Sequence, residues 1–161
     1  MDIILEAGLP HQQIPVDHLA DVFKRTHLDK PVKPYENPQI DLMDVTTEHN
    51  LRNIIFTQEM KPYNRKVVRP EMGPLNLDIK METGTGKTYV YTHSIYELHK
   101  RYGFNKFVVV VHSLPVKSGA VQFIGDPYVQ RHFRDTLGYG SEIELCEVSA
   151  LKKKKKGHNY F

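Results

Sequence analysis

The amino-acid sequence predicts an α/β protein in which helices cover a parallel sheet. Residues 75–81 alternate apolar and polar side chains, with the period of two that is typical of a strand. Residues 107–111 form an uninterrupted apolar run, as in strands that are buried on both faces. A helical pattern follows each of these segments, and short strand–helix–strand connections favour right-handed crossovers and a parallel sheet.

A first helix is expected near the start of the chain, over residues 13–25. Pro15 is tolerable in a first turn, and four apolar residues fall on one face: Val16, Leu19, Ala20 and Phe23. Three prolines within residues 31–38 then indicate an extended connector.

A second helix is expected over residues 47–58, and the proline-containing residues 61–74 resemble a loop. We therefore predict a helical and loop segment over residues 1–74. The sheet-containing part is expected to occupy residues 75–161.

Two further helices are expected in this second part. Residues 87–102 have an apolar face made of Tyr91, Ile95, Leu98 and Tyr102, and Gly103 can end the helix. Residues 126–137 begin with Asp126 as a cap and repeat Val129, Phe133 and Leu137 at helical spacing, and Gly138 ends them. A third strand is expected over residues 143–148.

The composition limits the function classes. The chain has 161 residues, 40% hydrophobic residues and a net charge of +3, which suit one globular domain without a membrane segment. The nine histidines and the single cysteine show no zinc-binding spacing. We expect a cytoplasmic protein, since no signal peptide is apparent and the lone cysteine cannot form an internal disulfide.

The segment M-E-T-G-T-G-K-T, residues 81–88, lies between a predicted strand and a predicted helix. Gly84 and Gly86 allow a tight turn whose N–H groups point inward, and the next helix adds its partial positive charge. Met81 stands where the common phosphate-loop signature has glycine, and we interpret it as the end of the strand.

Two side chains complete the expected phosphate site. Lys87 can reach the β- and γ-phosphates as a point charge, and the Thr88 hydroxyl can hold Mg²⁺. The alternative is a glycine-rich connection between a strand and a helix that binds nothing.

The sequence D-I-K-M-E-T-G-T-G-K-T-Y-V-Y, residues 78–91, resembles the restriction (Res) subunit of type III restriction–modification enzymes. The resemblance extends over nearly the whole chain. It implies a RecA-like ATPase domain, the first part of a superfamily-two helicase motor. Such a domain carries a parallel sheet, and here it would be incomplete at the C-terminus.

By this resemblance Thr83, Gly84, Thr85, Gly86, Lys87 and Thr88 bind the phosphates of ATP, with Lys87 as the catalytic residue and Thr88 as the Mg²⁺ ligand. Motors of this class also use a glutamine near the start to recognise adenine, and a glutamine amide both donates and accepts hydrogen bonds. Gln12 is the candidate and Gln13 the second choice. The alternative for both is a polar helix start.

The resemblance also implies a contact with DNA after the second strand. In such motors this loop, residues 111–117 here, touches the nucleic-acid backbone through groups that do not recognise sequence. Ser113 and Lys117 are the candidates. His112 stands where relatives often have proline, and a surface loop without a ligand is the alternative.

Features that a complete motor needs are missing from this sequence. No Asp-Glu pair follows Lys87, and no second domain could supply an arginine finger. We therefore expect an N-terminal part of a Res subunit that is inactive alone. The whole enzyme would cut double-stranded DNA together with its methyltransferase (Mod) subunit. The alternatives are a free-standing small P-loop NTPase or kinase, and an inactive nucleotide- or DNA-binding fragment.

Overall fold

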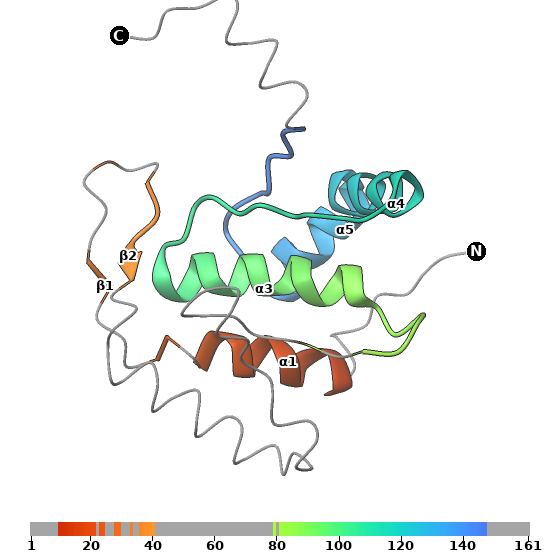
Figure 1. Cartoon of the computed structure of the whole chain (residues 1–161). Coiled ribbons are helices and arrows are strands. Elements are labelled where there is room, and N and C mark those ends of the chain that lie inside the picture. Colours follow the sequence, from red (N-terminus) through yellow and green to blue (C-terminus); the bar gives the residue numbers. More distant parts are fainter. Residues whose placement is uncertain are drawn as a thin grey trace, which may run out of the picture. The chain divides into compact units, whose positions relative to one another are not determined.

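The computed structural model of the chain describes residues 10–21, 23–24, 28–29, 33, 36–40, 79 and 81–147. The chain divides into two compact units, Met1–Val109 and Val110–Phe161. Figure 1 shows the helices and strands of the described residues.

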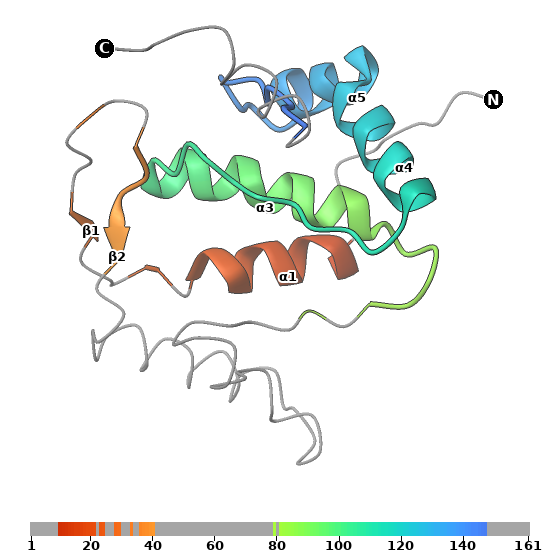
Figure 2. The ribbon, with the colours of Figure 1, turned by 45° about the horizontal axis from the view of Figure 1, so that its top comes forward.

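Two helices lie side by side among the described residues of the first unit. They are α1 (Pro10–Asp21) and α3 (Lys87–Tyr102), and both views of the ribbon show them next to each other (Figures 1 and 2). Gln12 bonds to Thr85 just before α3 begins, and the Tyr102 hydroxyl donates to the carbonyl oxygen of Ala20 over 2.6 Å. The two helices therefore run in the same direction.

Helix α1 begins three residues earlier than the sequence predicts and also ends earlier. Pro15 consequently lies in its second turn rather than its first. The predicted apolar face is largely confirmed, because Val16, Ala20 and Phe23 are buried. The Phe23 ring packs against Tyr102 at a centroid distance of 5.7 Å and against Phe104 at 5.6 Å.

Helix α3 has the bounds that the sequence predicts. Gly103 follows it in the left-handed conformation, with φ 75°, and its N–H donates to the carbonyl of His99 over 2.9 Å. The predicted inward face is wrong in part: Tyr91, Ile95, Leu98 and Tyr102 are only half-buried, whereas Tyr89, Val90 and Tyr96 are buried. The sequence predicts a parallel sheet covered by helices, and no such sheet is found among the described residues.

A short antiparallel ladder lies in the predicted connector. Strands β1 (Leu28–Asp29) and β2 (Gln39–Ile40) pair with Leu28 opposite Ile40. Next to β2, the Asn37 side chain accepts from the N–H groups of Asn105 and Lys106, both over 2.7 Å, and donates to the Lys106 carbonyl over 2.8 Å. One side chain thus satisfies the backbone groups that follow α3.

The predicted parallel sheet is not found among the described residues. Ile79 and Met81 lie outside any strand, and so do residues 107–111 and 143–147, while the rest of residues 75–81 and Val148 fall outside the described part. Val108 and Val110 are 83% and 88% exposed. An apolar segment becomes a strand only when a neighbouring strand completes its backbone hydrogen bonds, and the described residues supply none here.

The described residues of the second unit contain three consecutive helical segments. They are α4 (Leu114–Gly125), α5 (Pro127–Arg131) and the π-helix η3 (His132–Thr136). The Asp126 carboxylate accepts from the N–H of Tyr128 over 2.7 Å, which confirms the predicted cap. Phe133 is fully buried, and Val129, Ile124 and Tyr139 are buried with it.

Helix α4 was missed, because residues 111–117 were interpreted as a loop. Ser113 occupies the position before the helix, and Pro115 lies in its first turn. A serine followed by a proline in this arrangement favours a helix start. The signal was therefore present in the sequence.

Two predictions lie outside the described residues: the helix over residues 47–58 and the loop over residues 61–74. The division of the chain at residue 75 stays a prediction for the same reason. Within the described part, every helix is too short or too polar to cross a lipid bilayer.

Candidate functional site

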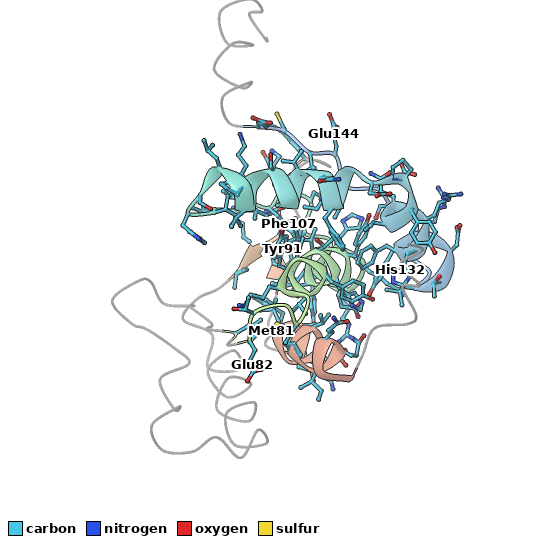
Figure 3. All side chains as sticks on the ribbon, turned by 90° about the vertical axis from the view of Figure 1, so that its right-hand side faces the viewer. Met81, Glu82, Tyr91, Phe107, His132 and Glu144 are labelled. Carbon is cyan, nitrogen blue, oxygen red and sulfur yellow. The ribbon has the colours of Figure 1, made fainter. Side chains whose placement is uncertain are left out.

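The loop before α3 has the backbone conformation that its glycines permit. Gly84 and Gly86 adopt left-handed φ angles of 83° and 88°, a region that side chains with a Cβ disfavour. Between them, the Thr85 hydroxyl donates to the carbonyl of Glu82 over 2.8 Å. Figure 3 shows Met81 and Glu82 on the segment that leads into α3. Two glycines with left-handed backbone angles thus lie just before the start of α3.

The N-terminus of α3 offers backbone donors and no competing negative charge. Gly86 precedes the helix, and its carbonyl accepts the first helical hydrogen bond, from Val90 over 3.0 Å. The N–H groups of the first turn have no acceptor within a helix, and they carry partial positive charge. The first turn of α3 contains no acidic residue. This end of α3 therefore suits an anion.

Lys87 and Thr88 stand in this first turn, as predicted. Lys87 is exposed and Thr88 is half-buried. Within the described part of the chain, no carboxylate forms an ion pair with Lys87. Its ammonium group is therefore available to a phosphate. The exposed Thr83 lies at the other end of the loop.

The structure brings Gln12 to the same loop, although 73 residues separate it from Thr85 in the sequence. The Gln12 side-chain amide donates to the Thr85 carbonyl over 3.2 Å. A Cβ on Gly86 would collide with this amide, so the glycine permits the close approach. Gln13 instead donates to Asp17 over 3.1 Å within α1. The geometry separates the two candidates and favours Gln12.

Sequence reasoning missed Arg101, which joins the far ends of α1 and α3. Its guanidinium lies 3.3 Å from Asp17 and 3.5 Å from Asp21 on α1, and it also binds Glu97 one turn earlier on α3. The spacing of Glu97 and Arg101 is visible in the sequence. The partners on α1 are not, because they lie 84 residues away in the case of Asp17.

The neighbouring Tyr102 keeps its proton. Burial raises the pKa of the Tyr102 phenol, and the Asp21 carboxylate raises it further, against the opposing effect of Arg101. A protonated hydroxyl is what the hydrogen bond to the Ala20 carbonyl requires.

The predicted DNA-contacting residues lie at the start of α4. Ser113 is half-buried and precedes the helix, and its carbonyl accepts from the N–H of Lys117 over 3.0 Å. The Lys117 ammonium forms an ion pair with Glu147 at 2.7 Å. The interpretation of Lys117 as part of a loop is therefore wrong, and its charge already has a partner.

No group of three histidine, cysteine or acidic side chains gathers in the described ranges in a way that could hold a metal ion. The single metal ligand that the sequence predicts, Thr88, would bind Mg²⁺ together with phosphate oxygens rather than in a cage of side chains.

The family described as "Type III restriction enzyme, res subunit" matches residues 37–159 of this chain. The chain is 35% identical over 151 residues to the type III restriction-modification enzyme EcoPI Res subunit of Escherichia phage P1, and 33% identical over 153 residues to the EcoP15I Res subunit of Escherichia coli. These alignments cover 91% and 92% of this chain and 15% of each relative.

A third relative is more similar over a shorter range. The StyLTI Res subunit of Salmonella typhimurium is 51% identical over 75 residues, which are 47% of this chain and 8% of that protein. The matches to the family and to the first two relatives together extend over most of the sequence. The chain belongs to the family of type III restriction enzyme Res subunits.

Proposed function

We propose that residues 83–88 bind Mg²⁺–ATP and that the chain contributes this nucleotide site to a type III restriction motor. The observation that supports it best is the junction of Gln12, Thr85 and Gly86. Gly86 has a left-handed φ angle and no Cβ, and the side-chain amide of Gln12 lies against it. A connection that binds nothing has no need of this convergence.

Each residue has a defined task in the proposal. The N–H groups of the loop and of the first turn of α3 bind the β- and γ-phosphates, and Lys87 neutralises their charge. The Thr88 hydroxyl is a ligand for Mg²⁺, which neutralises phosphate charge when bound. Gln12 is the proposed adenine-binding residue, because a glutamine side-chain amide can both donate and accept hydrogen bonds.

Titration calorimetry with Mg²⁺–ATP tests this proposal. We expect Lys87→Ala to weaken binding by more than about tenfold, because a charge-assisted contact to phosphate is lost. Lys24→Ala is the matched control, since Lys24 is also exposed but lies beyond the far end of α1. Equal affinities for the wild type and Lys87→Ala would refute the site.

The chain spans about 15% of the length of the relatives EcoPI Res and EcoP15I Res, so the activity of a whole enzyme is inferred. We infer a RecA-like domain whose parallel sheet includes residues 107–111. In the whole enzyme, ATP hydrolysis would drive action on double-stranded DNA in complex with the Mod methyltransferase. Ser113 and Lys117 are proposed to touch the DNA backbone.

The chain by itself is expected to hydrolyse ATP only slowly. Lys87 and Thr88 can bind phosphate and metal, but no Asp-Glu pair follows them to orient water. An arginine finger by itself raises the rate of hydrolysis by about 10³- to 10⁵-fold, so its absence would lower the rate by the same factor.

A steady-state ATPase assay separates this proposal from a free-standing P-loop NTPase or kinase. A monomer of residues 1–161 that turns over ATP faster than about one per second would favour the free-standing enzyme. Binding without such turnover supports the motor. No binding at all would leave an inactive fragment.

A further inference from the structure

Arg101 stands at the opposite end of the α1–α3 pair from the nucleotide loop. Helices α1 and α3 run in the same direction, so the Gln12–Thr85 contact joins their N-terminal ends and Arg101 joins their C-terminal ends. Figures 1 and 2 show the pair side by side along its length. These two contacts fix the position of α1 along α3 at both ends of the pair.

The three acidic partners of Arg101 need a guanidinium between them. Asp17 and Asp21 lie four residues apart on α1, and Glu97 adds a third carboxylate from α3. Like charges at this spacing repel each other. A guanidinium has five donors in a fixed fork and can serve three carboxylates, whereas a lysine ammonium is a point charge. Without Arg101, this repulsion would weaken the attachment of α1 to α3 at this end.

The network continues along α1 toward the loop. The Asp17 oxygen that faces Arg101 at 3.3 Å also accepts from the Gln13 amide over 3.1 Å. Gln13 directly follows Gln12 in the same turn of α1. From Asp17 to Gln12, α1 rises only about 7–8 Å, since a helix rises 1.5 Å per residue. The hydrogen bond between the Gln13 and Asp17 side chains spans the turn that contains Pro15. A shift of Asp17 therefore displaces the Gln12 amide.

We propose that Arg101 is a positioning residue for nucleotide selection. It holds α1 through Asp17 and Asp21 in the register at which Gln12 reaches both Thr85 and an adenine base. This inference rests on the proposed function, because it needs ATP to bind at residues 83–88. It adds a residue that touches neither nucleotide nor loop.

The experiment measures the affinities of Mg²⁺–ATP and Mg²⁺–GTP for the wild-type chain, Arg101→Gln, Gln12→Ala and the double variant. We expect Arg101→Gln to lower the ATP-to-GTP preference by about three- to tenfold, the size of one hydrogen bond. Loss of Gln12 should lower it by as much or more. In the Gln12→Ala background, Arg101→Gln should then change the preference little, because both act through one contact.

Arg134→Gln is the matched control. Arg134 also binds two carboxylates, Asp135 at 2.9 Å and Glu142 at 3.2 Å, but it belongs to the second unit. We expect it to leave the preference unchanged. Arg101→Lys should behave like Arg101→Gln, because an ammonium does not replace the fork.

The outcomes separate the two proposals. If the wild type binds neither nucleotide, the proposed function fails. If it prefers ATP and Arg101→Gln has the same preference, the positioning role is refuted. The role is also refuted if affinities for ATP and GTP fall equally, because that would mean a general loss of the fold.

A second variant covers the case in which Arg101→Gln does not fold by circular dichroism. The triple variant Arg101→Gln, Asp17→Asn, Asp21→Asn removes the repulsion together with the guanidinium. It should fold and show the same reduced preference. A folded triple variant with the wild-type preference, or one that is also unfolded, would make the network a stability element and overturn the positioning role.

Discussion

The two loops for which the sequence predicts ligands differ in their backbone conformation and in the partners of their lysines. Residues 83–88 contain two left-handed glycines, end at a helix start without acidic residues, and present a lysine that no described carboxylate pairs with. Residues 111–117 contain no glycine, pass into α4 after Ser113, and present a lysine that Glu147 binds at 2.7 Å. The first loop is open to an anion, while the second already has an internal partner.

The difference shows which features make a loop available to a ligand. Glycine permits left-handed backbone angles, so the local sequence indicates that residues 84 and 86 can form this turn. The availability of a lysine depends on residues distant in sequence, as Glu147 is from Lys117. A basic residue in a loop is therefore weak evidence for a phosphate contact until its acidic neighbours are known.

The largest expected effect concerns the glycines of the first loop. Gly86→Ala should lower the free energy of unfolding by about 2–3 kcal/mol: about 1–2 for the left-handed φ and about 1 for the lost Gln12–Thr85 hydrogen bond. Gly84→Ala should lower the free energy of unfolding only by the amount due to the left-handed φ, because an added Cβ would meet no atom within 4 Å. Urea unfolding of both variants gives the difference. Equal losses would mean that Gln12 makes no contribution at this junction.

The second prediction concerns the other loop and DNA. Binding to duplex DNA should be weak, indifferent to sequence and reduced by salt, because only backbone contacts are available. Glu147→Gln should raise the affinity by about two- to fivefold, since it removes an exposed ion-pair partner of Lys117.

Lys117→Ala completes this test. It should reduce the slope of log affinity against log salt by about one, the value for one phosphate contact. Fluorescence anisotropy over a salt series measures both variants. Sequence-specific binding that survives high salt would contradict the assignment of this chain to a motor.

The smallest expected effect is a pH dependence of the second unit. Burial lowers the pKa of His132, so the folded chain binds a proton less readily than the unfolded chain. The free energy of unfolding should therefore be unaffected above the unfolded pKa of about 6.5 and should fall as the pH decreases below it. His132→Gln should lessen this decrease. Thermal unfolding at pH 7.5 and pH 5.5 compares the variant with the wild type.

Much of the helical structure follows from local signals. The bounds of α3, its glycine stop and the Asp126 cap of α5 agree with the sequence, because each depends on residues within one turn. The start of α4 after Ser113 also follows from such local signals. The predicted strand over residues 107–111 needs partners far away in the sequence, and Val108, Val109 and Val110 are exposed in the structure.

The candidate site divides in the same way. Gly84, Gly86, Lys87 and Thr88 are adjacent in sequence, and the glycine spacing indicates the loop. The choice of Gln12 over Gln13 needed the contact with Thr85, which joins residues far apart in the chain. Arg101 could not be identified beforehand, because its role arises only where α1 meets α3.

The central claim is that the first loop, and not the second, binds nucleotide together with Gln12. Adding Mg²⁺–ADP to the ¹⁵N-labelled chain and recording amide spectra tests it at each residue. We expect shifts of the backbone amides of Gly84, Gly86, Lys87 and Thr88 and of the Gln12 side-chain amide, while Ser113 and Lys117 stay unchanged. Shifts confined to residues 111–117, or a Gln12 amide that does not respond, would contradict the account.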